Sequence, residues 1–356
     1  MARSTLRAMR ISSHLLILLA VTLLSGCYYG HLAMGQWQLI RGQTPITDLL
    51  AKPDLDPELR EKLSLVEAAR SYASTQLQLP DNDSYRRYKA LGRPHVVWNV
   101  FAAPALSIEA KTWCHLLVGC LAYRGYFDED KARREAARLS QKGWDTYVGG
   151  VSAYSTLGWF DDPLLDTMLA WSPERLVGLL FHEISHQRLF VEGDTQFNES
   201  YASFVELQGL RQWLAEQGRG AEAVEAQLRR EADFSALIQQ AREDLAAIYA
   251  GQQTEADKRQ AKQQRIEVLR GQYRALRDGA WDGYAGYDRW FASEINNAKL
   301  APVALYNQWL PAFEQLFDDN DRNWAKFHLA AAILADMPEA ERRQRLQQLA
   351  AGEPDA

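Results

Sequence analysis

The sequence predicts an α+β fold that is predominantly α-helical, with a small sheet upstream of one central helix and a long helical hairpin downstream of it. Three observations favour this class. Apolar residues recur at helical spacing over most of the chain. Two short segments before residue 160 are rich in β-branched and aromatic residues, which is typical of strands. Residues 221–277 are almost free of Pro and Gly, which favours long helices.

The first elements lie upstream of residue 160. Residues 57–91 show helical spacing interrupted by "LPDND", which predicts two helices joined by a turn. Residues 95–103, "HVVWNVFAA", predict a strand, and residues 144–158 predict a second one. The paired glycines at 149 and 150 indicate a bulge or a hairpin inside the second strand.

The remaining elements are helices. "KARREAARLSQKG" lies between the two strands and is closed by its final glycine. The central helix, "SPERLVGLLFHEISHQRLF", has Ser172 as its N-cap and Pro173 at its first position. Asn198 is expected to cap the next helix. Residues 221–277 predict two helices broken near "YAGQQT", which form either an antiparallel hairpin with solvated charges or a coiled coil that binds a protein partner.

The first 26 residues predict a signal peptide. Three arginines precede an apolar run over residues 15–24, which is too short to cross a bilayer comfortably. The run ends in "LLSGC", which resembles a bacterial lipobox and implies that Cys27 carries a lipid anchor. The alternatives are an ordinary cleaved signal and an uncleaved anchor helix. Tyr28 stands where an aspartate would signal inner-membrane retention, so we expect the outer membrane, with the protein facing the periplasm.

The mature chain, residues 27–356, is expected to be one domain with the 221–277 hairpin as an insertion. It carries 37 Lys and Arg against 46 Asp and Glu, a net charge of −9. This acidic balance gives no reason to expect nucleic acid as a partner. No later segment is long and apolar enough to cross a membrane. The composition can bury a sizeable core.

Two further cysteines, Cys114 and Cys120, stand six residues apart. In an oxidising periplasm they could form a disulfide that closes a small loop. Two buried free thiols, or a metal pair with His115, are the alternatives. The chain has no other cysteines to complete a four-thiolate site, so we expect the disulfide.

The central helix carries an H-E-x-x-H motif. Residues four apart share one helix face, so His182 and His186 can aim two imidazole nitrogens at one metal ion. Glu183 lies about 100° round the helix, where it could reach a water as a general base without being a ligand. The alternative is a pair of histidines on a buried face, hydrogen-bonded to core carbonyls.

A catalytic zinc site needs a third protein ligand and an open fourth position. Glu199 is the candidate, because it lies thirteen residues after His186 near the start of the next helix. A short loop would let that helix double back beside the first. The alternative is a glutamate that only favours the positive end of its own helix dipole.

The H-E-x-x-H helix followed by "NESYA" resembles the gluzincin metallopeptidases. "VGGVSAYSTLGWFDDP", "FHEISHQ", "GDTQFNESYASFVE", "TWCHLLVGCLAYRGYFD" and "NNAKL" resemble, over nearly all of the mature chain, a lipoprotein family called putative aminopeptidases. The resemblance implies one Zn²⁺ on His182, His186 and Glu199, with Glu183 as the base that hydrolyses a peptide substrate. In better-studied gluzincins the third-ligand glutamate follows at a longer interval, so the loop here must be tight.

Other site residues are less well defined. Gluzincins often stabilise the oxyanion with a Tyr or His from a later segment, for which Tyr306 is the choice and Tyr201, Tyr284 and Tyr287 are rivals. Ligating histidines usually donate their second N–H to a carboxylate or carbonyl. Glu206 could accept it, since it lies seven residues beyond the third ligand on the same helix face. Asp194 could also do so, or could simply hold a turn.

The substrate class is expected from two features. Residues 151–158, "VSAYSTLG", lie where gluzincins place an edge strand that pairs with an extended peptide, although an internal strand is equally compatible. An aminopeptidase must also bind the free ammonium, and residues 149–159 contain no glutamate for this. Asp161, Asp162 and Glu192 are the candidates to replace it. The alternatives are an endopeptidase, a cell-wall peptide amidase, and a non-catalytic envelope lipoprotein with a structural metal.

Overall fold

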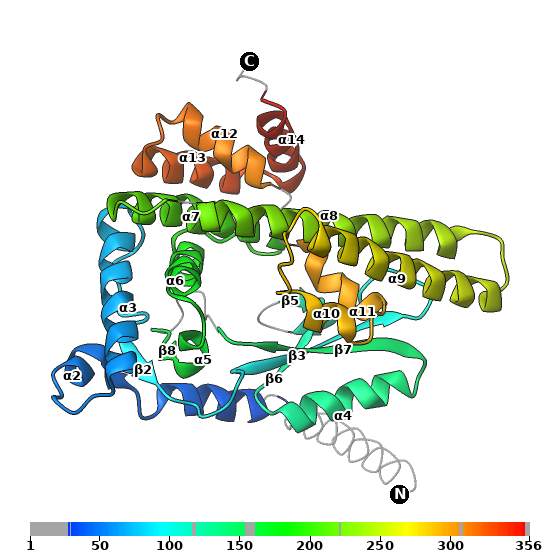
Figure 1. The fold of residues 1–356 in the computed structure, drawn as a ribbon, viewed down its shortest axis with the longest axis horizontal. Coiled ribbons are helices and arrows are strands. Elements are labelled where there is room, and N and C mark those ends of the chain that lie inside the picture. Colours follow the sequence, from blue (N-terminus) through cyan, green and yellow to red (C-terminus); the bar gives the residue numbers. More distant parts are fainter. Residues whose placement is uncertain are drawn as a thin grey trace, which may run out of the picture.

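The structure of the protein is a computed structural model that describes residues 28, 30–115, 119–153, 161–220, 222–305 and 309–352. Over these residues the chain is mostly helical with small sheets, which confirms the predicted α+β, predominantly α-helical class (Figure 1). The predicted lipid attachment site, Cys27, and the predicted oxyanion residue, Tyr306, lie outside the described residues. Within the described ranges, no helix combines the length and the apolar character needed to cross a bilayer.

The N-terminal part contains a helix over residues 30–40, followed by short elements that build a three-stranded sheet in the order β1-β2-β8. Strands β1 and β2 pair antiparallel, whereas β2 and β8 pair parallel. The elements are β1 (Thr44–Pro45), α2 (Ile46–Leu50), α3 (Pro57–Thr75), β2 (Arg87–Lys89) and β8 (Leu164–Leu165).

The prediction of two helices in residues 57–91 is wrong, because only α3 forms and the second half becomes a loop and strand β2. The loop is held by the buried guanidinium of Arg70, which donates to the carbonyl oxygens of Pro80 and Asn82. Gln78 and Tyr85 have positive φ angles, which a helix does not allow. Tertiary hydrogen bonds therefore override the helical spacing here.

A second sheet is antiparallel in the order β6-β3-β7, with β6 (Arg124–Tyr126), β3 (Val97–Pro104) and β7 (Trp144–Val151). The register of β3 and β7 is unbroken from Val97 opposite Val151 to Pro104 opposite Trp144. The expected bulge or hairpin at the paired glycines is therefore absent from β7. Instead, a Cβ atom on Gly150 would lie 2.2 Å from Cδ2 of His95, so the glycine leaves room for that ring.

The two faces of β3 pack against different helices because successive side chains of a strand point to opposite sides. Trp98, Val100 and Ala102 pack with α4 (Glu129–Ser140), which begins at the N-cap Asp128. Phe101 and Ala103 pack on the other face with Ala298 of α11 (Asn297–Leu300). A small hairpin of β4 (Trp113–His115) and β5 (Gly119–Leu121) follows β3 in sequence, and a disulfide joins Cys114 to Cys120.

The central helices follow β8. They are α5 (Asp166–Leu169), α6 (Pro173–Arg188) and α7 (Thr195–Glu216). Helix α6 begins as predicted, with Ser172 accepting the N–H of Arg175 and Pro173 in the first turn. Helix α6 packs between α3 and α7 in the largest apolar core, and α12 (Leu310–Asp319), α13 (Trp324–Asp336) and α14 (Glu339–Ala350) lie on the far side of α7 (Figure 1).

The predicted helical hairpin consists of α8 (Glu222–Ala250) and α9 (Glu255–Asp278), which pack side by side and extend from the body (Figure 1). Helix α10 (Asp288–Ala292), α11 and the 3₁₀ helix η1 (Ala301–Leu305) follow. The hairpin is attached to the sheet by polar contacts. Lys262 of α9 pairs with Asp145 of β7, whose carboxylate also accepts the N–H of Asn297, and Tyr249 of α8 donates to the Asn297 side chain.

Candidate metal centre

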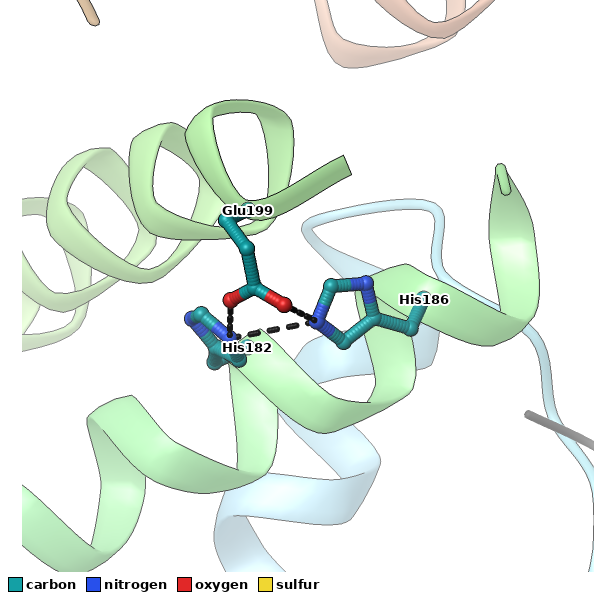
Figure 2. A group of neighbouring side chains, drawn as sticks. All are labelled: His182, His186 and Glu199. Carbon is teal, nitrogen blue, oxygen red and sulfur yellow. Dashed lines mark hydrogen bonds and ion pairs between the residues drawn. The ribbon is translucent and has the colours of Figure 1, made fainter. Parts of the chain in front are cut away.

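The candidate site is formed where α7 crosses α6. His182 and His186 lie one turn apart on α6, and Glu199 extends toward them from α7 (Figure 2). The three side chains are the only group of potential metal ligands found in the described ranges of the chain. All three are largely buried, with side-chain exposures of 15%, 7% and 20%. The sequence-predicted ligands are therefore brought together by the packing of two helices.

The distances between the three groups fit a metal ion. Nε2 of His182 lies 3.2 Å from Nε2 of His186. The two carboxylate oxygens of Glu199 lie 3.4 Å from Nε2 of His182 and 3.8 Å from Nε2 of His186. In a tetrahedral zinc site with bonds of about 2.0–2.1 Å, neighbouring ligand atoms are about 3.4 Å apart. The group could therefore hold a metal ion with little rearrangement.

His182 is oriented by a second carboxylate. Its Nδ1 lies 3.0 Å from Oε2 of Glu206, which leaves Nε2 directed at the other two ligand groups. Room for Glu206 comes from a glycine one turn earlier on α6, since a Cβ atom on Gly178 would lie 3.0 Å from Oε1 of Glu206. Glu206 was predicted from its spacing to Glu199 on one helix face. The role of Gly178 could not be predicted, because nothing in the neighbouring sequence indicates it.

His186 is the more buried of the two histidines. Its Nδ1 is buried, and no hydrogen-bond partner for it is found among the described residues. A buried polar atom without a partner is unfavourable, by about 1–3 kcal/mol. Coordination through Nε2 would leave the ring proton on Nδ1, and no acceptor comparable to the Glu206 carboxylate beside His182 is found for it among the described residues.

The short loop between α6 and α7 is closed by a side chain from the first turn of α7. Asn198 accepts the N–H of Val191 at 2.8 Å and donates to the carbonyl oxygen of the same residue at 2.7 Å. These two bonds fix the residue directly before Glu199. Asn198 is therefore inside α7 and is not its N-cap, so that prediction is wrong.

Asp194 is the N-cap of α7, because its side chain accepts the N–H of Phe197 and the helix begins at the following residue. Its other carboxylate oxygen pairs with the buried guanidinium of Arg342 in α14 at 2.8 Å. These contacts make Asp194 part of the turn, the second of its two predicted roles, rather than a partner of a ligating histidine. The sequence contains two residues of the type that caps helices, Asp194 and Asn198, and the pattern does not show which of them is the N-cap.

The electrostatics of the site favour positive charge at its centre. Burial acts to lower the pKa of His182, but hydrogen bonds to Glu199 and Glu206 outweigh it and raise that pKa well above its ordinary value. Burial and the charge of His182 lower the pKa of His186 to about 4. The pKa of Glu199 is lowered because the two histidines outweigh its burial. A divalent cation would satisfy the same carboxylates.

The pKa of Glu183 lies near neutrality. Burial, followed by the charges of Glu199, Asp162 and Glu206, raises its pKa to about 7, although His182 opposes the shift. A general base is most effective when its pKa lies near the working pH. Of the three acidic residues considered for an ammonium anchor, Asp162 is buried and acts on Glu183, whereas Asp161 and Glu192 are exposed.

The tyrosines considered for the oxyanion are placed differently. Tyr201 is fully buried, and its hydroxyl is bonded to Nδ1 of His328 at 2.8 Å. Tyr284 and Tyr287 pack in the separate apolar cluster of the hairpin. Tyr123 was not among the predicted candidates, and its pKa is raised by burial first and by the charge of Glu199 next. Nothing in its local sequence distinguishes it from the other tyrosines.

The expected edge strand is described only in part, because residues 154–160 lie outside the described residues. Strand β7 reaches Val151 and, over the described ranges, is hydrogen-bonded to a neighbouring strand on one side only, where it meets β3. It is therefore an edge strand of this sheet as far as the chain is described.

Comparison with known proteins identifies the family. The family model described as "Putative aminopeptidase" matches residues 27–346. No curated protein sequence and no solved structure gives a match. Because the family match covers most of the 356 residues, and because the centre built on α6 and α7 lies within it, the chain belongs to the putative aminopeptidase family.

Proposed function

We propose that the protein is a zinc-dependent metallopeptidase of the gluzincin kind, which acts as an aminopeptidase. The observation that carries the proposal is the convergence of His182, His186 and Glu199 beside Glu183, a partly buried glutamate on α6 whose pKa is raised to about 7. Two imidazoles and one carboxylate are a common ligand set of catalytic zinc in peptidases. Family membership supports the reaction class, since the family description names a peptidase.

The proposed chemistry divides between the metal and the chain. When bound, Zn²⁺ would polarise the scissile carbonyl and acidify a water. Glu183 would accept the proton of that water at its carboxylate and pass it to the leaving amine. Glu206 would keep the His182 ring in position by accepting its Nδ1–H. The raised pKa of Glu183 suits both steps, because the group can gain and lose a proton near neutrality.

The exopeptidase part of the proposal concerns the free amino end of a substrate. A carboxylate near the base could pair with that ammonium group, and Asp162 is the candidate because its charge reaches Glu183. Edge strand β7 could pair with the extended backbone of the substrate. Endopeptidase or cell-wall amidase activity would need no ammonium partner, so blocked substrates distinguish these reactions.

The proposed location is the bacterial cell envelope. We propose that residues 1–26 are removed as a signal peptide and that Cys27 carries a lipid that anchors the protein in the outer membrane, facing the periplasm. The "LLSGC" sequence and the disulfide between Cys114 and Cys120 support an oxidising compartment. Mass spectrometry of the mature N-terminus tests the lipid, and an unmodified Cys27 would contradict it.

The function is tested by turnover of free-amino and N-blocked peptides, with zinc counted in the same sample. Glu183→Gln should keep the metal and lower turnover by at least about 100-fold, because only the base is lost. Glu199→Ala should instead lower the zinc content. Glu61→Gln, on the exposed surface of α3, is the matched control and should change neither.

The outcomes of this experiment distinguish the candidate functions from one another. Cleavage confined to free amino ends supports the aminopeptidase, and cleavage of blocked peptides makes the protein an endopeptidase. Undiminished turnover in Glu183→Gln would rule out the proposed base. A zinc-loaded wild-type protein that cleaves nothing would point to a structural metal.

A further inference from the structure

The helix over residues 30–40 has one buried face and one exposed apolar face. Leu39 is only 1% exposed, and Gly35 lies against the ring of Phe127, where a Cβ atom would come within 2.0 Å of Cδ2. Met34 and Trp37, three positions apart on the opposite side, are 58% and 57% exposed. Ile40 continues this stripe and is 45% exposed. Exposed apolar side chains that gather in this way usually mark an interaction site.

A hollow of about 560 Å³ lies beside the exposed stripe and shares no residue with the candidate metal centre. Its wall combines apolar and basic groups, including Met34, Trp37, Leu91, Arg41, Lys89 and Arg93. None of its lining residues is acidic, although the whole chain has a net charge of −6. The hollow is therefore locally cationic on an acidic protein. An adjoining smaller hollow shares Arg93 with the first one and also contains Lys131, but its wall includes one acidic residue, Asp128.

One basic group in this wall, Arg93, is held by two hydrogen bonds. The guanidinium of Arg93 is half-buried and donates to the carbonyl oxygens of Phe127 and Val96. Lys89 lies on β2, and Arg41 follows the helix and is exposed. Three cations beside exposed apolar side chains match a layer of phosphate groups above an apolar interior.

The start of the described chain is attached to the same side of the body. The Tyr28 hydroxyl donates to the carbonyl oxygen of Gly125 at 3.1 Å, and the guanidinium of Arg124 lies 3.9 Å from the centre of the Tyr28 ring. A chain tethered to a bilayer just before Tyr28 would have no long linker. Trp37 would then lie about 15 Å along the helix from the tether.

We propose that this surface, which we call the N-terminal face (Met34, Trp37, Ile40, Arg41 and Lys89), docks on a bilayer that contains anionic phospholipids. Trp37, Met34 and Ile40 enter the boundary between headgroups and acyl chains, and the cations bind lipid phosphates. Each basic residue near such a surface contributes about 1 kcal/mol, or roughly fivefold in the docked population. Docking through the N-terminal face therefore sets the orientation of the protein relative to the membrane.

The proposed orientation places the opposite side of the molecule in water. The helix over residues 30–40 lies along one edge of the view, and α12, α13 and α14 lie at the other, beyond α7 (Figure 1). Leu329 on α13 is 65% exposed and therefore provides a reporter on the far side. Docking and the peptidase reaction use different residues, so the two can fail independently.

The test uses the full chain in vesicles of phosphatidylcholine with or without phosphatidylglycerol. A spin label is placed at Ile40→Cys or, for comparison, at Leu329→Cys, and its collisions with a water-soluble relaxing agent are measured. We expect the label at position 40 to be shielded only in anionic vesicles, while the label at position 329 stays in water. In the labelled chain, Arg41→Glu with Lys89→Glu should lower the docked population at least about tenfold.

The matched control reverses Lys326 and Arg343, two exposed cations on the far side of the molecule, and should leave position 40 shielded. Equal exposure of positions 40 and 329 to the relaxing agent would overturn the proposal, as would equal shielding in neutral vesicles. Turnover of a soluble peptide is measured in parallel. An active protein with position 40 in water disproves docking alone, and an inactive protein that docks disproves only the peptidase.

Discussion

At the scale of single residues, the candidate site depends on small groups as much as on its ligands. Glu206 fits closely against α6 beside His182, because Gly178 one turn earlier has no side chain to displace its carboxylate. A glycine inside a helix lowers its stability by about 0.5–1 kcal/mol relative to alanine. We infer that the lower helix stability at this position is offset by the orientation of His182, a candidate metal ligand.

Gly178→Ala tests this interpretation. The added Cβ would lie 3.0 Å from Oε1 of Glu206, so the carboxylate must move by a few tenths of an ångström. We expect metal affinity to fall about tenfold, since loss of such outer partners typically has effects of that size, while the melting temperature stays the same or rises. Competition with a chromogenic chelator measures the affinity.

Gly271→Ala in α9 is the matched control, because the nearest atom to its new Cβ would be 3.9 Å away. It should raise stability and leave metal affinity unchanged. If both alanine variants bind metal as tightly as the wild type, Gly178 has no role in placing Glu206.

At the scale of elements, the sequence predicted the helix ends that are determined by neighbouring residues in the chain. The start of α6 was predictable because Ser172 and Pro173 fix it within one turn. The start of α7 was not, because Asn198 is used to close the preceding loop through Val191. The missing second helix in residues 57–91 has the same cause, since a distant group, Arg70, holds the loop.

Asn198→Ala should separate loop closure from simple helix stability. The variant loses two buried side-chain bonds to Val191, and we expect the free energy of unfolding to fall by about 2 kcal/mol. Metal affinity should also fall, because Glu199 is the next residue. Denaturant unfolding and chelator competition measure the two effects.

The comparison variant is Asn323→Ala, which removes the N-cap of α13. It should lower stability by about 1 kcal/mol without altering metal affinity. A loss of stability in Asn198→Ala with unchanged metal affinity would show that the loop does not position Glu199.

At the scale of the whole molecule, the residues that tie distant segments together could not be predicted. His328 on α13 bonds to the carbonyl oxygen of Leu77, just beyond α3, and to the hydroxyl of Tyr201 on α7, both at 2.8 Å. Segments more than 250 residues apart in sequence meet there. Spacing within one helix reveals partners such as Glu206, but it carries no information about a junction of three elements.

The same junction predicts a pH dependence of stability. Burial lowers the pKa of His328 to about 4, with a further contribution from the charge of Arg188. In the unfolded chain the pKa is about 6.5, so between these values the unfolded state binds a proton that the folded state does not. Neutral His328 makes its full contribution to the free energy of unfolding above pH 6.5. That free energy should fall by up to about 3 kcal/mol as the pH drops to 4.

His328→Gln isolates this effect, because glutamine keeps a donor and an acceptor but does not titrate. Denaturant unfolding of both proteins is measured at several pH values. The difference between wild type and variant should shrink as the pH falls through this window, whereas parallel curves would exclude His328 as the cause.

The position of the three ligand groups on two separate helices has a consequence for the thermodynamics of the whole chain. Unfolding separates α6 from α7, so the unfolded chain retains no comparable site. Any ion that binds His182, His186 and Glu199 then stabilises only the folded state, by about 1.4 kcal/mol for each tenfold of free ion above its Kd. The free energy of unfolding would therefore depend on the supply of metal, and a metal-starved cell would hold a less stable population of the same protein.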